Sequence, residues 1–369
     1  MNDLANSLIL NKMNKKLLYL LPLMMVVGCA EKIGTEDAVG VAPFTLSVDR
    51  TEIESDGKQE ATFKITDANG VVLTDNTELM SKIYFKNEAT GRRLARKTKI
   101  FRSVEDGDYT FSATFSGEPC ENTVTIKSQN RTTYEVFKKN VCLYRFTATW
   151  CQNCPSMTEG LDRVNDWTKG RLVELDMHGA GSTYALSDGT RFVADHLISQ
   201  FKAGGFPSCV YDLDLMSDSR AYSEIEELVF NRIADAPATC GIKASSTFSN
   251  DKLTLQASVK TSTGGTYDLG YALLVNNLDG GAGAYEDKYH NVVIALSANY
   301  ENLSNAAAEI AKDQEKQIVN FTQDVTIPEG AKLDDCSLVV FALKQNGSDI
   351  DIDNAVRFPL GGSVDYIYN

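Results

Sequence analysis

Short runs of alternating apolar and polar residues fill the chain between residues 43 and 129. Alternation is typical of a strand with one buried face, because successive side chains on a strand point to opposite sides. Turn-forming clusters at residues 67–70 and 105–108 separate the runs. The pattern predicts a small β-sandwich over residues 43–129. Its expected strands lie in residues 44–50, 61–67, 81–87, 109–117 and 122–128.

The pattern changes to alternating strands and helices between residues 130 and 237. Residues 140–150 read as a strand, and a helix is expected from Cys154, with Pro155 in its first turn where a missing N–H costs nothing. These alternations predict a central α/β domain over residues 130–237. Its other expected elements are strands in 171–177 and 206–213 and helices in 192–201 and 222–236.

The last segment, residues 238–369, returns to strand patterns. Residues 240–262 predict a hairpin whose turn lies near Asn250 and Asp251. The segment is therefore expected to form a C-terminal antiparallel β-sandwich. Four further strands are expected in residues 267–277, 291–300, 318–327 and 336–347.

The N-terminus has the composition of an export signal. Lys12, Lys15 and Lys16 precede an apolar run at residues 17–27, which is too short to span a bilayer. The run ends in a small residue followed by Cys29, and this resembles the bacterial lipoprotein signal. The resemblance implies removal of residues 1–28, acylation of Cys29, a tether over 29–42, and attachment to the membrane through the lipid alone. The alternative is a conventional signal with an incidental cysteine.

The net charge limits the possible binding partners. Export determines whether the cysteines can form disulfides. The net charge of −14 argues against binding nucleic acid, which requires a basic face. In an exported chain the eight cysteines can be oxidised. If Cys29 carries lipid, an odd number remains, so at least one thiol lacks an intramolecular partner. The favoured structural bridge is Cys240–Cys336, a Cys120–Cys142 bridge is a second possibility, and Cys209 is expected to be a small buried apolar residue.

One pair of cysteines carries most of the expected chemistry. Cys151 and Cys154 form a C-x-x-C at the predicted start of a helix, where free N–H groups and the helix dipole favour a thiolate. Cys151, expected to be the more exposed, would attack a disulfide, and Cys154 would resolve the product. A structural disulfide without turnover remains an alternative. No metal is expected, because zinc needs four ligands and the histidines show no ligand spacing. A Cys-His-Asp nucleophile using His178 or His196 has little support, and no motif implies a cofactor.

The central segment resembles the thioredoxin superfamily. Trp150 directly precedes Cys151, as in the family's W-C-x-x-C motif, and Phe206–Pro207 opens a later strand, like the family's cis-proline loop. The resemblance implies that this loop packs against the cysteines and offers backbone groups to an extended substrate. The longer spacing implies an insertion around residues 178–190. Arg145 stands where the family usually carries an acidic residue that moves a proton, and arginine cannot act as a base.

Together, the lipoprotein signal, the C-x-x-C-P segment and the β-rich tail that ends at residues 354–369 resemble a Bacteroidota outer-membrane lipoprotein family named for a protein of twenty-eight kilodaltons. This resemblance covers about residues 130–369. The N-terminal β segment resembles bacterial immunoglobulin-like domains. The resemblance implies an outer-membrane location, with the membrane face open. We expect a lipid-anchored envelope protein that exchanges thiols and disulfides with cysteine-containing exported proteins. The alternative is a non-catalytic lipoprotein that binds surface ligands or acts as a scaffold, in which the thioredoxin-like domain is structural.

Overall fold

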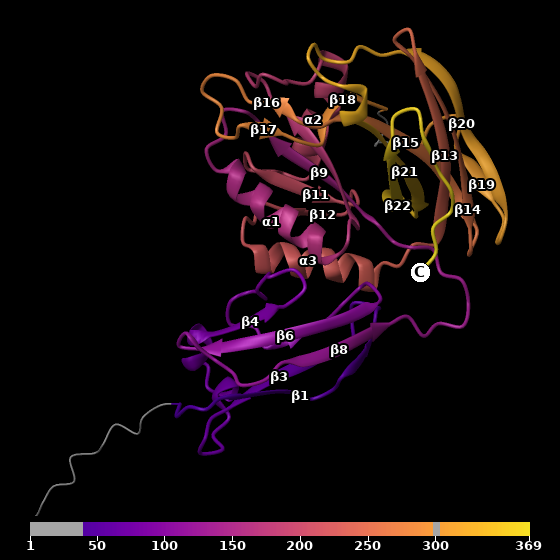
Figure 1. Ribbon diagram of the computed structural model, residues 1–369. Helices are drawn as coiled ribbons and strands as arrows, with labels where there is room; N and C mark the ends of the chain where they lie inside the picture. The colour runs from indigo at the N-terminus through magenta and orange to yellow at the C-terminus, as the bar shows by residue number, and fades with distance from the viewer. Residues whose placement is uncertain (1–39, 298–302) are drawn as a thin grey trace, which may run out of the picture. The chain divides into compact units, whose positions relative to one another are not determined.

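The computed structural model describes residues 40–297 and 303–369, which lie in one compact unit (Figure 1). The predicted signal peptide at 1–28, the acylation site Cys29 and most of the tether at 29–42 lie outside the described residues. Within the described part of the chain, no helix is both long enough and apolar enough to cross a bilayer.

The N-terminal segment forms two sheets with a shared apolar core. One sheet has the order β1-β3-β5, and the other has the order β2-β8-β6-β4, with β7 on β6. Phe63 of β3 packs edge-on against Phe111 of β6, with ring centroids 5.0 Å apart, so aromatic rings fill the space between the sheets. The elements are β1 (Thr45–Val48), β2 (Glu52–Glu54), β3 (Ala61–Thr66), η1 (Leu73–Asp75), η2 (Leu79–Lys82), β4 (Ile83–Asn87), β5 (Ile100–Phe101), β6 (Gly107–Phe115), β7 (Glu118–Pro119) and β8 (Val124–Gln129).

A nine-stranded mixed sheet dominates the rest of the described residues. Its members are β9 (Val141–Thr147), β10 (Leu172–His178), β11 (Ser208–Tyr211), β12 (Leu215–Ser217), β15 (Gly265–Val275), β18 (Val292–Leu296), β19 (Ala308–Ile310), β21 (Cys336–Asn346) and β22 (Asp349–Pro359). The order is β12-β11-β9-β10-β18-β15-β21-β22, and β19 pairs with β15. Strands β9 and β10 are parallel, and every residue of both is buried.

Helices cover both faces of the β9–β10 part of this sheet. The three α-helices of the described residues are α1 (Cys154–Trp167), α2 (Asp188–Gln200) and α3 (Tyr222–Asp235). Leu143 packs in one core with α1 and α3, whereas Tyr144 packs in another with α2. Adjacent strand residues point to opposite faces, so α2 lies across the sheet from α1 and α3.

The C-terminal strands add a second layer. The four-stranded sheet has the order β20-β14-β13-β23 and shares a core with the β15, β18 and β21 part of the nine-stranded sheet. Asn250 and Asp251 both have positive φ and form the predicted hairpin turn between β13 and β14. The remaining elements are β13 (Cys240–Ser249), β14 (Lys252–Thr261), β16 (Leu278–Asp279), β17 (Lys288–Tyr289), β20 (Glu315–Asp324), η3 (Leu333–Asp335) and β23 (Ser363–Val364).

The predicted fold class, with a central α/β thioredoxin-like domain between two separate β-sandwiches, is wrong. The chain is mostly β, and the central strands form one end of the nine-stranded sheet. The junction is the parallel pair β10–β18, in which Asp176 lies opposite Val292 and its N–H donates to the carbonyl of Asn291, 2.9 Å away. The physical reason is that a sheet ending at β10 would leave an unpaired edge, which β18 covers.

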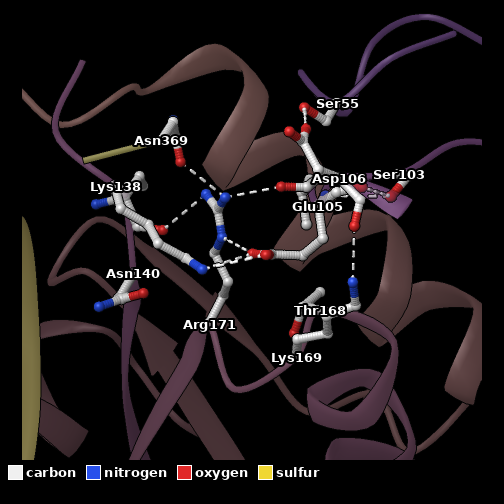
Figure 2. A network of polar contacts seen from close by, with 12 residues as sticks. Ser55, Ser103, Glu105, Asp106, Lys138, Asn140, Thr168, Lys169, Arg171 and Asn369 are labelled. Atoms are coloured by element: carbon white, nitrogen blue, oxygen red, sulfur yellow. Dashed lines mark hydrogen bonds and ion pairs between the residues drawn. The ribbon is translucent and has the colours of Figure 1, made fainter. Parts of the chain in front are cut away.

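A buried polar network connects the N-terminal sheets to the rest of this unit (Figure 2). Arg171, just before β10, donates to the carboxylate of Glu105, to the carbonyl oxygens of Val104 (2.7 Å) and Lys139 (3.3 Å), and to the side chain of Asn369 (2.8 Å). Buried polar groups with every partner in place hold one arrangement firmly. This network fixes the start of β10 against the N-terminal segment.

Candidate functional site

The carboxyl ends of the parallel strands β9 and β10 meet at one edge of the sheet, where ligand sites of α/β sheets usually lie. The chain leaves β9 at Thr147 and forms a tight turn, in which the N–H of Cys151 donates to the carbonyl of Ala148 (3.1 Å). Cys151 and Cys154 form a disulfide with a Cα–Cα distance of 5.4 Å. Cys154 is the first residue of α1, so the disulfide closes the turn onto the N-terminus of that helix.

The second predicted site element lies against this disulfide. The peptide bond between Phe206 and Pro207 is cis, and it directly precedes β11, which pairs with β9. Phe206 packs against the buried cluster that contains both cysteines, and its ring stacks on Trp150 with centroids 5.6 Å apart. The structure therefore brings together Trp150, Phe206 and Pro207 with the two cysteines. The functional roles predicted for these residues remain predictions.

The exposure of the two cysteines differs little. Cys151 is 4% exposed and Cys154 is 2% exposed, whereas Trp150 is 49% exposed. The expected order holds, but both cysteines are buried, and Phe206 is the partly exposed side chain of their cluster. The stacked rings of Trp150 and Phe206 therefore provide the partly exposed surface next to the buried cysteines.

Arg145 has a buried acidic partner. It lies opposite Asp176 of β10, and the two side chains form a buried ion pair with an Nη2–Oδ2 distance of 2.5 Å. Arg145 also donates to the hydroxyl of Thr158 (2.9 Å), which itself donates to the carbonyl of Cys154 (3.2 Å). The guanidinium thus connects a buried carboxylate to the first turn of α1. The sequence analysis missed Asp176, because its position opposite Arg145 depends on the pairing of two strands.

Burial and this ion pair shift the pKa values of both partners. Burial raises the pKa of Asp176 well above its usual value, and the charge of Arg145 opposes that rise. Burial lowers the pKa of Arg145, but the charges of Asp176 and Glu174 outweigh burial and raise it overall. Arg145 therefore remains charged, and Asp176 is the group of the pair that can gain or lose a proton.

Two more titratable groups lie on the same face of β10. Burial raises the pKa of Glu174 to about 7, opposed by the charge of Arg145. Burial, together with the charge of Arg145, lowers the pKa of His178 to about 3, so His178 is neutral near pH 7. Its Nδ1 shares a hydrogen bond of 2.8 Å with the hydroxyl of Ser182.

Several buried polar atoms around these residues have no hydrogen-bond partner within the described part of the chain. Native proteins leave few such atoms, and each one needs a physical explanation. Such atoms mark this end of the sheet as a place where polar groups are available for chemistry or for a ligand. The atoms are Arg145 Nε, Thr147 Oγ1, Asp176 Oδ1, His178 Nε2 and Ser208 Oγ.

The loop after β10 is shaped around the stacked rings. A Cβ atom on Gly179 would lie 2.3 Å from Cε2 of Phe206, so only glycine admits the ring in this position. The indole N–H of Trp150 donates to the carbonyl of Ala180 (3.0 Å), and Gly181 has a φ of +77°. The sequence analysis treated this loop as an insertion. The two glycines that closely follow a buried strand are the signal that could have identified it.

The C-terminal segment also reaches the site. The N–H of Tyr285 and the hydroxyl of Tyr289 both donate to the carbonyl of Thr149, at 3.2 Å and 3.3 Å. Tyr289 also packs edge-on against His178. The residue before Trp150 is therefore held by Tyr285 in the loop before β17 and by Tyr289 of β17 itself.

The predicted bridges among the other cysteines are wrong. Within the described residues, Cys120, Cys142, Cys209, Cys240 and Cys336 are free thiols. Cys240 and Cys336 belong to strands of different sheets and fill the same core as small apolar groups. Burial raises the pKa of Cys209 and Cys240 well above the usual range, which makes them poor nucleophiles. Among residues 40–297 and 303–369, no three His, Cys, Asp or Glu residues are grouped to hold a metal ion.

Comparisons with known proteins add a fold likeness. No family model and no curated protein matches the chain. The chain is similar to the solved structure of HBP35 of Porphyromonas gingivalis, a Bacteroidota protein, with 21% identity and a TM-score of 0.51, over 62% of this chain and 77% of that one. A protein from Agrobacterium tumefaciens gives 16% identity and a TM-score of 0.41, over 64% of this chain and 100% of that one. The first likeness extends to the fold alone, the second carries no argument, and membership of the family that the sequence resembles remains a prediction.

Proposed function

We propose that this protein exchanges disulfides with thiols of other exported proteins at the cell envelope. The observation that carries the proposal is the Cys151–Cys154 disulfide, which closes onto the N-terminus of α1 and lies beside the cis Phe206–Pro207 bond. The export-signal pattern of residues 1–28 supports the cellular location. Attachment to the outer membrane through lipid on Cys29 is part of the proposal.

The exchange has two balanced steps. A substrate thiolate attacks Sγ of Cys151, the disulfide breaks, and its electron pair leaves with Sγ of Cys154 as a thiolate. A second substrate thiolate then attacks the substrate sulfur of the mixed disulfide and releases Cys151. The substrate dithiol becomes a disulfide, and the protein gains two electrons and two protons as a dithiol. The reverse sequence reduces a substrate disulfide.

The N-terminus of α1 supports the first step. Asn153, the residue before the helix, makes no side-chain capping bond. The N–H of Cys154 donates to the carbonyl of Cys151 (3.3 Å), and Pro155 has no N–H, so the positive end of the helix dipole is the feature of α1 that stabilises a thiolate formed here. A stabilised thiolate is a better leaving group and favours opening of the disulfide.

The backbone beside the disulfide supports a polypeptide substrate. Within the described residues, no hydrogen bond joins the main chain of Phe206 to another residue. An N–H and a carbonyl that are free next to a reactive disulfide are suited to pair with an extended peptide, as in β-strand addition. Such pairing would align a substrate cysteine with Cys151.

The proposal is tested by thiol exchange with purified protein. Dithiothreitol should reduce the Cys151–Cys154 disulfide, and the reduced protein should then cleave an aromatic disulfide such as dithiobis(nitrobenzoate). Cys151→Ser should remove more than about 99% of this rate, because the attacking thiolate is lost. Cys154→Ser should accumulate a stable mixed disulfide at Cys151, because the resolving thiol is lost.

Cys120→Ser is the matched control. Cys120 is a half-buried free thiol, whereas the other free thiols of the described residues are buried. The control should keep the rate of the unsubstituted protein. A disulfide that resists dithiothreitol, or an equal rate in Cys151→Ser, would contradict the proposed function.

A further inference from the structure

A cavity of about 310 Å³ lies between the carboxyl end of β10, the loop that follows it, and α2. Its walls are mainly apolar and include Trp150, Met177, Leu186, Ile198 and Phe206. The volume is at the lower end of the range for ligand pockets, so the cavity has room for one large side chain and not for an extended cofactor.

The cavity adjoins the proposed reaction site. Trp150 immediately precedes Cys151, and Phe206 belongs to the buried cluster of the two cysteines. Their stacked rings therefore form a wall of the cavity on one side and lie beside the disulfide on the other. A substrate whose cysteine reaches Cys151 places a neighbouring side chain at this cavity.

The walls of the cavity are mainly apolar, and its polar groups are few. His178 is neutral near pH 7, and its buried Nε2 has no partner within the described residues. Two charged residues of α2 also line the cavity: Arg191 donates to the carbonyl of Leu186 (3.1 Å), and Asp195 is exposed to solvent. Met177 adds a flexible thioether, which adapts to apolar groups of different shape. A charged side chain would lose its hydration here without gaining an ion pair at His178.

We propose that this cavity binds a large apolar side chain, such as that of phenylalanine or leucine, next to the reacting cysteine of a polypeptide substrate. The inference rests on the proposed function and names its substrate class. Apolar burial in the cavity holds the substrate cysteine at Cys151, while the free main chain of Phe206 aligns the peptide backbone. The site selects cysteines with an apolar neighbour in sequence.

The test uses pairs of synthetic peptides whose cysteine carries thionitrobenzoate in a mixed disulfide. The peptides of a pair differ only in the residue next to cysteine, which is phenylalanine or serine. Reduced protein attacks the peptide sulfur and releases thionitrobenzoate, which absorbance follows. We expect the phenylalanine peptide to react at least about tenfold faster, in line with the discrimination that apolar pockets achieve.

Two substitutions in the cavity check that it is the origin of this preference. Ala194 is buried on α2 and lines the cavity. Ala194→Phe should fill the space and bring the two peptide rates to within about threefold of each other. Ile198→Ala should enlarge the cavity and shift the preference from leucine towards tryptophan. Ser199→Phe places the same ring at an exposed position of α2 and should leave both the preference and the rate unchanged.

The outcomes separate this inference from the proposed function. If the unsubstituted protein cleaves dithiobis(nitrobenzoate) but treats both peptides alike, the cavity proposal is wrong and disulfide exchange remains. If it cleaves neither reagent, the proposed function fails and the cavity proposal fails with it. A preference for phenylalanine over serine that survives Ala194→Phe also overturns the cavity proposal.

Discussion

The two ends of strand β10 carry buried polar groups that differ in their hydrogen bonding. At the amino end, each guanidinium nitrogen of Arg171 donates to an oxygen of the protein (Figure 2). At the carboxyl end, Asp176 and His178 each keep a buried polar atom without a partner in the described residues. Only a strand of seven residues separates the two ends, so their positions along the chain do not explain the difference in hydrogen bonding.

The amino end has the properties of a structural joint. Lys138 adds a second cation at Glu105, with an Nζ–Oε1 distance of 2.9 Å, and the neighbouring Lys169 donates to the carbonyl of Asp106 (2.9 Å). A network in which every member is satisfied specifies one arrangement and leaves nothing to bind a further group. Its function is to hold the start of β10 against the N-terminal segment.

The carboxyl end has the properties of a working site. Buried polar atoms without a hydrogen-bond partner in the described residues lie there, near a disulfide and a cavity. Proteins keep such violations mostly where function requires them. The completeness of the hydrogen bonds, more than burial or charge, separates the structural polar cluster at Arg171 from the candidate functional one.

The largest effect is expected from breaking the structural cluster. Arg171→Met keeps most of the side-chain volume but leaves Glu105 and two carbonyl groups without this donor. Removing one partner of a buried ion pair costs about 4 kcal/mol in the free energy of unfolding. Denaturant unfolding of the two proteins measures the difference.

Arg131→Met is the matched control, because Arg131 pairs with Glu52 at an exposed position. Exposed ion pairs contribute about 1 kcal/mol or less. If both substitutions change the free energy of unfolding equally, the Arg171 network is not the joint that the comparison requires.

A smaller effect, with a definite pH dependence, is expected at Glu174. The pKa of Glu174 is about 7 in the folded protein and has a reference value of 4.5. Between these two pH values the folded state keeps a proton that the unfolded state has lost, so stability falls as pH rises and is constant above about pH 7. The fall amounts to about 3 kcal/mol.

Glu174→Gln should remove this fall, so the variant should gain about 3 kcal/mol relative to the unsubstituted protein between pH 4.5 and pH 8. Unfolding curves measured across that range test the difference. Glu118→Gln, at an exposed position, controls for the loss of one negative charge. If the difference in the free energy of unfolding between the two proteins does not vary with pH, burial does not raise the pKa of Glu174 in the folded protein.

The sequence was sufficient for elements whose signals are local. The helix expected from Cys154 is α1, and the helix expected over 222–236 is α3, because apolar spacing and a proline in the first turn act within a few residues. The cis bond implied at Phe206–Pro207 is present. These features depend on short stretches of chain that do not need to find a distant partner.

The sequence was insufficient where distant strands choose their neighbours. Alternation shows which residues are buried but not which strand lies beside them. The pairing of β10 with β18 therefore went unpredicted, and with it the continuous sheet that replaces a separate α/β domain. The same limit hid Asp176 opposite Arg145 and made Cys240 and Cys336 look like a bridge.

The smallest effect is expected from a substitution at Gly179, which follows the carboxyl end of β10 and packs against Phe206. Gly179→Ala places a Cβ atom 2.3 Å from Cε2 of Phe206, so the ring must move, and such overpacking costs about 1–3 kcal/mol. Gly204→Ala is the matched control in the same region, because its Cβ would meet no atom within 4 Å. Denaturant unfolding compares the two, and near-ultraviolet circular dichroism reports the Trp150–Phe206 stack. Equal stability and equal spectra in the two variants would show that Gly179 does not shape the site, and that the rings beside the disulfide are held in place by other contacts.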